Sequence, residues 1–290
     1  MGRQTSADHD PWRIRSDAQP GRQSLMALDW ERLDTTEDRH PPIITVYGGE
    51  GLGKTTLASE FPAPYYVQTG KNERPPTGIE MPTRGLCEEY ADIVNQIDWM
   101  LEDDHDRLTF VLDTLDSAEP LVVAEACARN GWSDISEGAF GAGGKAVASV
   151  WRELINKLID LKHAGFAVVL LGHAKVKTDP GVTTDSYPRY RLNLSDDAGN
   201  AVSHASDIVG YIHQRVSIVK EKAGFHKDNV RKRGEGGGDR QIAIEERPGF
   251  VAKNRYRLSG TLPFKEGHGY EEIAKHIIVP TGRQVAEPAE

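Results

Sequence analysis

Residues Gly48 to Thr55 read GGEGLGKT, which matches the spacing G-x-x-x-x-G-K-[ST] at every fixed position. Glycines at this spacing let successive backbone N–H groups point at one anion, and the helix that follows adds its positive end. The Lys54 ammonium is placed to contact β- and γ-phosphate oxygens, and the hydroxyl of Thr55 to ligate Mg²⁺. The alternative is an inert glycine-rich turn, which the preceding strand, the lysine and the threonine disfavour. We expect ATP and Mg²⁺ to be bound by nine consecutive residues: Gly48, Gly49, Glu50, Gly51, Leu52, Gly53, Lys54, Thr55 and Thr56.

Asp113 is the candidate for the second group beside the magnesium. It closes the apolar run LTFVLD, and a phosphate loop needs a metal-orienting carboxylate at the end of a neighbouring buried strand. The alternative is that Asp113 caps the helix expected from about Ser117, a role for which Asp116 is better placed. Asp116 and Glu119 are also candidates for groups that lie behind the metal-orienting acid.

His173 follows another apolar run, FAVVLLG. At the carboxyl end of a parallel strand a polar side chain faces the ligand crevice, where it can contact the γ-phosphate and relay that contact to the next loop. The alternative is a histidine with a purely structural role. Its position favours a γ-phosphate sensor.

Apolar runs and helical patterns alternate through the chain that follows Pro42. The runs lack polar alternation, as strands do when both faces of a parallel sheet are covered. Strands are expected at Ile43–Tyr47, Tyr65–Gln68, Leu108–Leu112, Phe166–Leu171 and within Ile208–Val219. Helices are expected to begin at Lys54 and to span Glu88–Leu101, about Ser117–Arg129, and Ala146–His163. The predicted fold class is α/β, with a mostly parallel sheet and helices on both faces.

The pattern changes after Gln214. The stretch Lys220–Arg240 is rich in Lys, Arg and Gly, and Gln241–Glu245 alternates like a half-exposed strand. These features predict an antiparallel hairpin at the sheet edge with a long, mobile tip. The expected organisation is a flexible extension (1–40), a nucleotide-binding core (41–265), and a C-terminal helix and tail (266–290).

Composition limits the partners and the compartment. The net charge of −9 argues against a protein that coats nucleic acid with its whole surface, but a local basic patch is compatible with it. Cys87 and Cys127 form neither a metal-ligand spacing nor a disulfide framework, so we expect lone buried thiols. No apolar run reaches the ~18 residues that span a bilayer, and the start of the chain lacks a signal-peptide pattern. We expect a cytoplasmic protein with no membrane partner.

Several separated motifs together resemble one family. GGEGLGKTT, VLDTLD, LLGHAKVK, ASDIV and VAKNRY occur in the order of RecA-like ATPases. The chain most resembles phage-encoded Sak-type annealing and recombination ATPases, which are RecA/RadA-like cores without accessory modules. The segments WSDISEGAFGAGGKAVASVWRELINKLIDL, DSYPRYRLNL and VRKRGEGGGDRQIAIEERPGFVAKNRY share the likeness, which covers roughly residues 41–265. It implies a RecA-like P-loop core, ATP hydrolysis stimulated by DNA and by assembly, and the host cytoplasm if the protein is phage-encoded.

The resemblance also implies roles for Lys253 and Arg255. In that family the lysine and arginine of the last motif reach across a subunit boundary to the neighbour's ATP, which implies self-association into a ring or filament. A cation supplied in trans stabilises the charge that develops on the transferred phosphoryl group. From the residues alone, two solvated cations on an exposed strand are an equal alternative.

The chain departs from the family at Gly70. The family usually ends its second strand with Gln-Thr-Glu, whose carboxylate polarises the attacking water, whereas this chain reads YVQTGKNERPP. Glu73 is the candidate replacement, if the loop is rearranged. Without a replacement, hydrolysis would be slow and ATP would act mainly as an assembly switch, because such a group contributes roughly 10²–10⁴-fold.

Two loops and the hairpin tip are the candidate contacts for single-stranded DNA. The resemblance implies mobile loops at Asn130–Lys145 and in the segment after His173. Glycine-rich backbone and scattered cations can both follow a phosphate chain. Tyr187 and Tyr190 are candidates for base stacking, with packing on the sheet as the alternative. The expected cations are Lys175, Lys177, Arg189 and Arg191, and in the tip, where a solvated charge run is the alternative, Lys227, Arg231, Lys232 and Arg233.

Three functions are therefore compared. The leading hypothesis is an ATP-dependent protein that binds single-stranded DNA in phage-type recombination or annealing, with a single-stranded-DNA-binding protein as a further candidate partner. The first alternative is a P-loop kinase of small metabolites or nucleotides, which would need a lid with arginines over its own ATP. The second is a nucleotide-switched scaffold with little hydrolysis, which the glycine at position 70 favours.

Overall fold

The computed structural model describes residues 38–180, 185–215, 217–222, 230–235, 238–256, 258 and 260–283, with the backbone alone for 217–222 and 230–235. Residues 39–290 form one compact unit. Nearly all of the extension expected at residues 1–40 lies outside the described residues, as does Lys227 of the expected hairpin tip.

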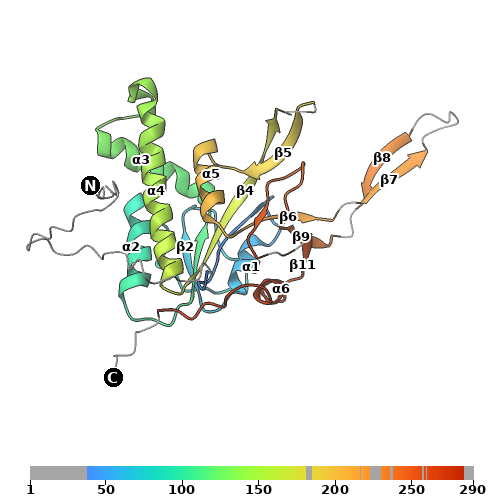
Figure 1. The fold of residues 1–290 in the computed structure, drawn as a ribbon, viewed down its shortest axis with the longest axis horizontal. Coiled ribbons are helices and arrows are strands. Elements are labelled where there is room, and N and C mark those ends of the chain that lie inside the picture. The colour runs from blue at the N-terminus through green and yellow to red at the C-terminus, as the bar shows by residue number, and fades with distance from the viewer. Residues whose placement is uncertain are drawn as a thin grey trace, which may run out of the picture. The chain divides into compact units, whose positions relative to one another are not determined.

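A mixed sheet, nine strands within the described residues, forms the centre of this unit (Figure 1). Five of its strands are parallel, in the order β6, β1, β4, β3, β2, and they run to the edge of the sheet at β2. They are β1 (Ile43–Gly48), β2 (Pro64–Gln68), β3 (Thr109–Asp113), β4 (Ala167–Asp179) and β6 (Ile208–Gln214). Each contains an apolar run, because strands covered on both faces need no polar alternation, and β4 continues beyond its run into the partly exposed HAKVKTD.

Antiparallel strands extend the sheet beyond β6. β9 (Arg240–Ala243) pairs with β6, β11 (Thr261–Phe264) pairs with β9, and the short β10 (Lys253–Asn254) pairs with the amino end of β6. The expected antiparallel hairpin at the edge is thereby confirmed. Its tip is not simply a mobile loop, because β7 (Ser217–Lys222) and β8 (Val230–Glu235) pair with each other in a two-stranded sheet of their own.

Helices cover both faces of the large sheet. One face packs against α2 (Tyr90–Glu102), α3 (Leu115–Asn130), α4 (Ala142–His163) and α5 (Asp196–Ala205), and the other against α1 (Lys54–Ser59) and α6 (Gly269–Ala274). Consecutive residues of β1 show the division, because Val46 is buried with Leu57 of α1 while Tyr47 is buried with Trp151 of α4. The α/β fold class with a mostly parallel sheet is confirmed.

The segment after His173 differs from the mobile loop that the sequence predicts. β4 continues past the carboxyl end of β1 to Asp179 and pairs antiparallel with β5 (Tyr187–Leu192), Val176 opposite Tyr190 (Figure 1). Over its described residues this segment is a β-hairpin, because pairing satisfies backbone groups that a loop would leave to water. The other expected loop is also shorter, since α4 begins at Ala142 rather than Ala146 and is preceded by two short 3₁₀ turns, η1 (Ile135–Glu137) and η2 (Ala139–Gly141).

The two cysteines match their expectation, because Cys87 and Cys127 are both buried and neither forms a disulfide. Among the helices of the described residues, none combines the length and the apolar character needed to cross a membrane.

Candidate functional site

The loop between β1 and α1 has the backbone that its glycines predict. Gly51 and Gly53 have φ angles of 69° and 87°, a left-handed conformation that favours glycine. A Cβ on Gly53 would lie 2.5 Å from Nη1 of Arg240, so this position lacks the space for a side chain as well. α1 begins at Lys54 directly behind the loop, and the first N–H groups of a helix have no partner within it. The loop can therefore present several N–H donors to one anion.

Three side chains meet behind this loop. Lys54 is 7% exposed, and its ammonium donates to the carbonyl oxygens of Gly49 at 2.9 Å and Gly48 at 3.4 Å. The hydroxyl of Thr55 donates to Oδ2 of Asp113 at 2.8 Å. Burial lowers the pKa of Lys54, an effect that the charge of Asp113 opposes, and burial raises the pKa of Asp113. Because the Thr55 hydroxyl and the Asp113 carboxylate lie within hydrogen-bonding distance of each other, both oxygens can ligate one Mg²⁺ ion whose other ligands are water and phosphate.

Asp113 reaches this place from a strand that does not pair with β1. β4 lies between β1 and β3, so the carboxylate is not on the neighbouring strand that we expected. It still meets Thr55, because the carboxyl ends of all five parallel strands lie at the same edge of the sheet. The hydroxyl of Tyr66, from β2, also donates to Oδ2 of Asp113 at 3.1 Å.

His173 is oriented by Asp116. The backbone N–H of His173 donates to Oδ1 of Asp116 at 2.9 Å, and its Nδ1 lies 2.8 Å from Oδ2. The expectation that Asp116 caps α3 is wrong, because the N-cap is Thr114, whose hydroxyl accepts from the N–H of Ser117 at 3.3 Å. With Nδ1 engaged, Nε2 is the ring nitrogen that can meet a ligand.

Glu73 lies beside Gly70. A Cβ built on Gly70 would be 2.6 Å from Cγ of Glu73, so the Glu73 side chain fills the space that a residue with a side chain at position 70 would need. The N–H of Glu73 donates to the carbonyl oxygen of Gly70 at 3.1 Å, which closes the turn. Burial raises the pKa of Glu73, and the negative charge of Asp113 raises it further. Its role in hydrolysis stays a prediction.

One cavity of about 540 Å³ brings these groups together. Its lining residues are Glu50, Gly51, Gly53, Lys54, Thr55, Thr56, Asn72, Glu73, Arg74, Pro76, Asp113, His173, Arg240 and Glu266. Arg240 was not among the expected site residues. Its guanidinium lies 2.8 Å from the carboxylate of Glu266 and 3.3 Å from the carbonyl oxygen of Leu52, above the ring of Phe264. The sequence could have pointed to Arg240 through its position, because it begins the strand that pairs with the carboxyl end of β6.

Lys253 and Arg255 lie at the opposite end of the sheet. Lys253 pairs with Val209 near the amino end of β6, whereas the phosphate loop leaves the carboxyl end of β1. Lys253 donates to two carbonyl oxygens at the C-terminal end of α5, at 2.8 and 2.9 Å, and Arg255 lies 3.1 Å from buried Asp207. The two cations are thus kept from the loop of their own chain, and a role in trans stays a prediction.

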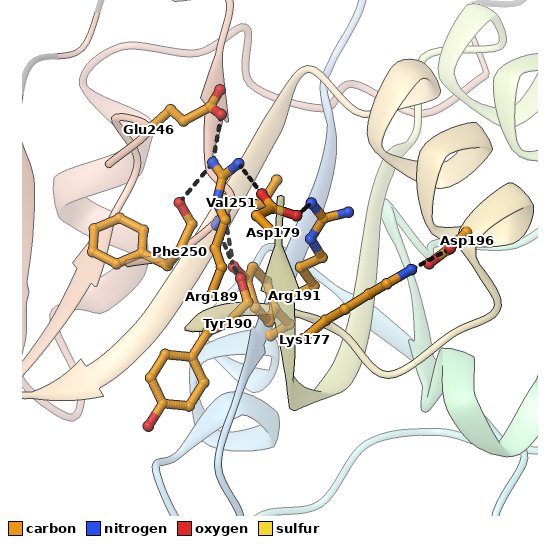
Figure 2. Close-up of polar contacts among 10 residues, drawn as sticks. Lys177, Asp179, Arg189, Tyr190, Arg191, Asp196, Glu246, Phe250 and Val251 are labelled. Atoms are coloured by element: carbon orange, nitrogen blue, oxygen red, sulfur yellow. Dashed lines mark hydrogen bonds and ion pairs between the residues drawn. The ribbon is translucent and has the colours of Figure 1, made fainter. Parts of the chain in front are cut away.

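The four expected cations of the β4–β5 hairpin are all engaged within this chain, and Figure 2 shows three of them, Lys177, Arg189 and Arg191. Asp179 binds both Arg189 and Arg191, and Arg189 also contacts Glu246. Lys177 pairs with Asp196. The remaining cation, Lys175, donates to the carbonyl oxygen of Leu194. In the tip, Arg231, Lys232 and Arg233 lie on β8, and their side chains fall outside the described residues.

Comparison with known proteins gives a family, one sequence relative and one solved structure of limited likeness. The family model described as "AAA domain" matches residues 40–256. The SPbeta prophage-derived uncharacterized protein YorG of Bacillus subtilis (strain 168) is 26% identical over 135 residues, or 46% of this chain. The chain spans 41% of the length of that relative. The crystal structure of the flagellar accessory protein FlaH from Methanocaldococcus jannaschii covers 78% of this chain and 86% of its own, with 10% identity and a TM-score of 0.34, which marks a distant overlap.

Proposed function

The chain belongs to the AAA domain family, and we propose that it is an ATPase that binds single-stranded DNA and supports phage-type recombination or strand annealing. Membership of this family shows that the chain contains a P-loop NTPase domain. That the nucleotide is ATP, that the chain binds single-stranded DNA and that it self-associates are parts of the proposal. The observation that carries it is the convergence of Lys54, Thr55, Asp113, Glu73 and His173 on one cavity.

The loop and the residues behind it bind the nucleotide. The backbone N–H groups of the loop and the Lys54 ammonium hold the phosphates, and Lys54 is already desolvated, which strengthens its pull on an anion. Thr55 and Asp113 hold Mg²⁺, which when bound neutralises charge on the β- and γ-phosphate oxygens. Thr56 and Arg74 line the same cavity and are available to the rest of the nucleotide.

Glu73 is the group that we assign to the attacking water. Its carboxylate replaces the glutamate that the resemblance to RecA-like ATPases implies at the position of Gly70, and the glycine there leaves the room that Glu73 occupies. A carboxylate whose pKa is raised is a better general base than an ordinary one once it is ionised. His173 meets the γ-phosphate, and because β4 runs from His173 into the β4–β5 hairpin, one strand joins the nucleotide to that hairpin.

Assembly completes the site in this proposal. Lys253 and Arg255 act on the ATP of a neighbouring copy, which the distance from their own loop along the sheet supports. Arg255→Ala should therefore spare ATP binding and reduce turnover, whereas turnover at the wild-type rate would make the assignment wrong. The Arg255 side chain is 54% exposed, and its buried partner Asp207 keeps the ion pair with Lys162 in this variant.

One experiment separates the functions: ATP turnover measured with and without single-stranded DNA over a range of protein concentrations. Stimulation by DNA and a steep rise with concentration support the proposal. Turnover at low concentration that depends on a small molecule would indicate the kinase, which the position of Arg240 beside its own cavity favours. ATP binding without turnover under every condition would leave the nucleotide-switched scaffold.

A further inference from the structure

The β4–β5 hairpin has two unlike faces. Cross-strand pairing places Lys177 opposite Arg189 on one face and Val176 opposite Tyr190 on the other. Three cations of the first face, Lys177, Arg189 and Arg191, are engaged with carboxylates (Figure 2). The fourth, Lys175, donates to a carbonyl oxygen. On the second face, Val176 is 57% exposed and Tyr190 is 43% exposed. The apolar face of this hairpin is therefore the one that lies open.

Tyr190 is the exposed end of a row of stacked rings. Its ring centroid lies 5.1 Å from that of Tyr211, at an interplanar angle of 20°. Tyr211 in turn lies 5.2 Å from both His213 and Phe250, at 13° and 27°. Two backbone hydrogen bonds, of 2.8 and 3.1 Å, tie Tyr190 to the residues on either side of Phe250. The row is thus assembled from β5, β6 and the segment before β10, and its geometry is fixed by the fold.

We propose that Tyr190, supported by Tyr211 and Phe250, is a base-stacking platform for single-stranded nucleic acid. This inference rests on the proposed function and names the part of the chain that meets the bases. Tyr211 covers one side of the Tyr190 ring, so the exposed part is a rigid aromatic surface that an unpaired base can cover. Such stacking tolerates any base, because every base has a π face, and it favours single strands, because the bases of a duplex are already stacked.

The charge along the chain beyond the row fits the same ligand. β6 carries Tyr211 and His213 and leads towards β7, which pairs with β8. The sequences of β7 and β8, SIVKEK and VRKRGE, hold five lysines and arginines against two glutamates. A basic pair of strands suits the phosphate backbone of a nucleic acid whose bases stack on the aromatic row.

The test compares a dT oligonucleotide with an abasic oligonucleotide of the same length and charge, by fluorescence anisotropy. The wild-type protein should bind the dT oligomer about tenfold more tightly than the abasic one. Tyr190→Leu should weaken dT binding about fivefold or more and leave abasic binding unchanged. Tyr190→Phe is the matched control, because it keeps the ring and removes only the hydroxyl, and it should behave like the wild type. Tyr190→Trp should keep the preference for dT.

Two outcomes overturn the platform and leave DNA binding in place. One is equal affinity of the wild-type protein for the dT and abasic oligomers. The other is an equal loss on both oligomers in Tyr190→Leu, because the ring would then act through the hairpin's structure and not through bases. If the wild-type protein binds neither oligomer, the DNA-binding part of the proposed function fails, and the platform fails with it.

Discussion

Lys54 and Asp113 in the phosphate cavity have neutral partners, whereas the arginines of the β4–β5 hairpin have charged ones. In the cavity, Lys54 is held by carbonyl oxygens and Asp113 by hydroxyls, and neither forms an ion pair within the described part of the chain. In the hairpin, Arg189 and Arg191 share the carboxylate of Asp179. Neutral partners leave the field of a charge available to a ligand, whereas an opposite charge cancels it. The cavity is therefore ready for an anion, and the hairpin cations must exchange partners before they contact one.

Lys54→Ala tests the ready site and should have the largest effect. The ammonium is buried and bonds to carbonyl oxygens, so it has no contact ion pair to break before it meets a phosphate. We expect nucleotide affinity to fall about 100-fold or more, as when one partner of a buried charge pair is lost. Titration with a fluorescent ATP analogue measures the loss. Affinity within a few-fold of the wild type would mean that the cavity does not bind phosphates.

Glu73→Gln should leave ATP binding intact and lower turnover about 100-fold, the lower end of the range for a general base. The matched control is Glu80→Gln, an exposed glutamate of the same connection between β2 and α2, which should have no effect. Turnover by Glu73→Gln at the wild-type rate would mean that Glu73 does not activate the attacking water, and it would favour the nucleotide-switched scaffold.

The pH dependence of turnover gives Glu73 an independent test. Its pKa is raised above the ordinary 4.5 by burial and by Asp113. A general base acts when it is deprotonated, so turnover should fall as the pH is lowered through this raised pKa. The acid limb of the pH–rate profile should therefore lie above pH 4.5. A limb at or below that value would indicate a different base.

Local patterns in the sequence predicted the phosphate cavity better than they predicted the hairpin. Lys54 was identified because it follows the glycine-rich loop, and Asp113 because it follows the apolar run LTFVL. Arg240 was missed although the pairing of β9 with β6 was expected, because its place beside Gly53 depends on the register of that pairing, which no local pattern in the sequence gives. The alternation in KVK and RYR is a two-residue period typical of paired strands, and it was passed over in favour of a loop. Side-chain type identified the cations, but only the fold shows that carboxylates already engage them.

Asp179→Asn should replace a charged partner of the hairpin arginines by a neutral one, as Lys54 has in the phosphate cavity. It removes the carboxylate that Arg189 and Arg191 share, which makes the Arg191 guanidinium available to phosphates, whereas Arg189 keeps its ion pair with Glu246. Affinity for single-stranded DNA should rise about fivefold at moderate salt, and the slope of log K against log salt should steepen by about 0.7 for the one added contact. Unchanged affinity and slope would mean that the charged face of the hairpin does not meet DNA.

Lys177→Gln should have the smallest effect, because Lys177 and its partner Asp196 are already 42% and 56% exposed. A pair so exposed contributes little to folding, so the free energy of unfolding should change by less than ~0.5 kcal/mol in denaturant titrations. The slope of DNA affinity against salt should nevertheless become shallower by about 0.7, because one phosphate contact is lost. Asp196→Asn is the control, since it leaves the lysine in place and should keep that slope. An unchanged slope in Lys177→Gln would confine the DNA contacts to the aromatic face and to the β7–β8 strands.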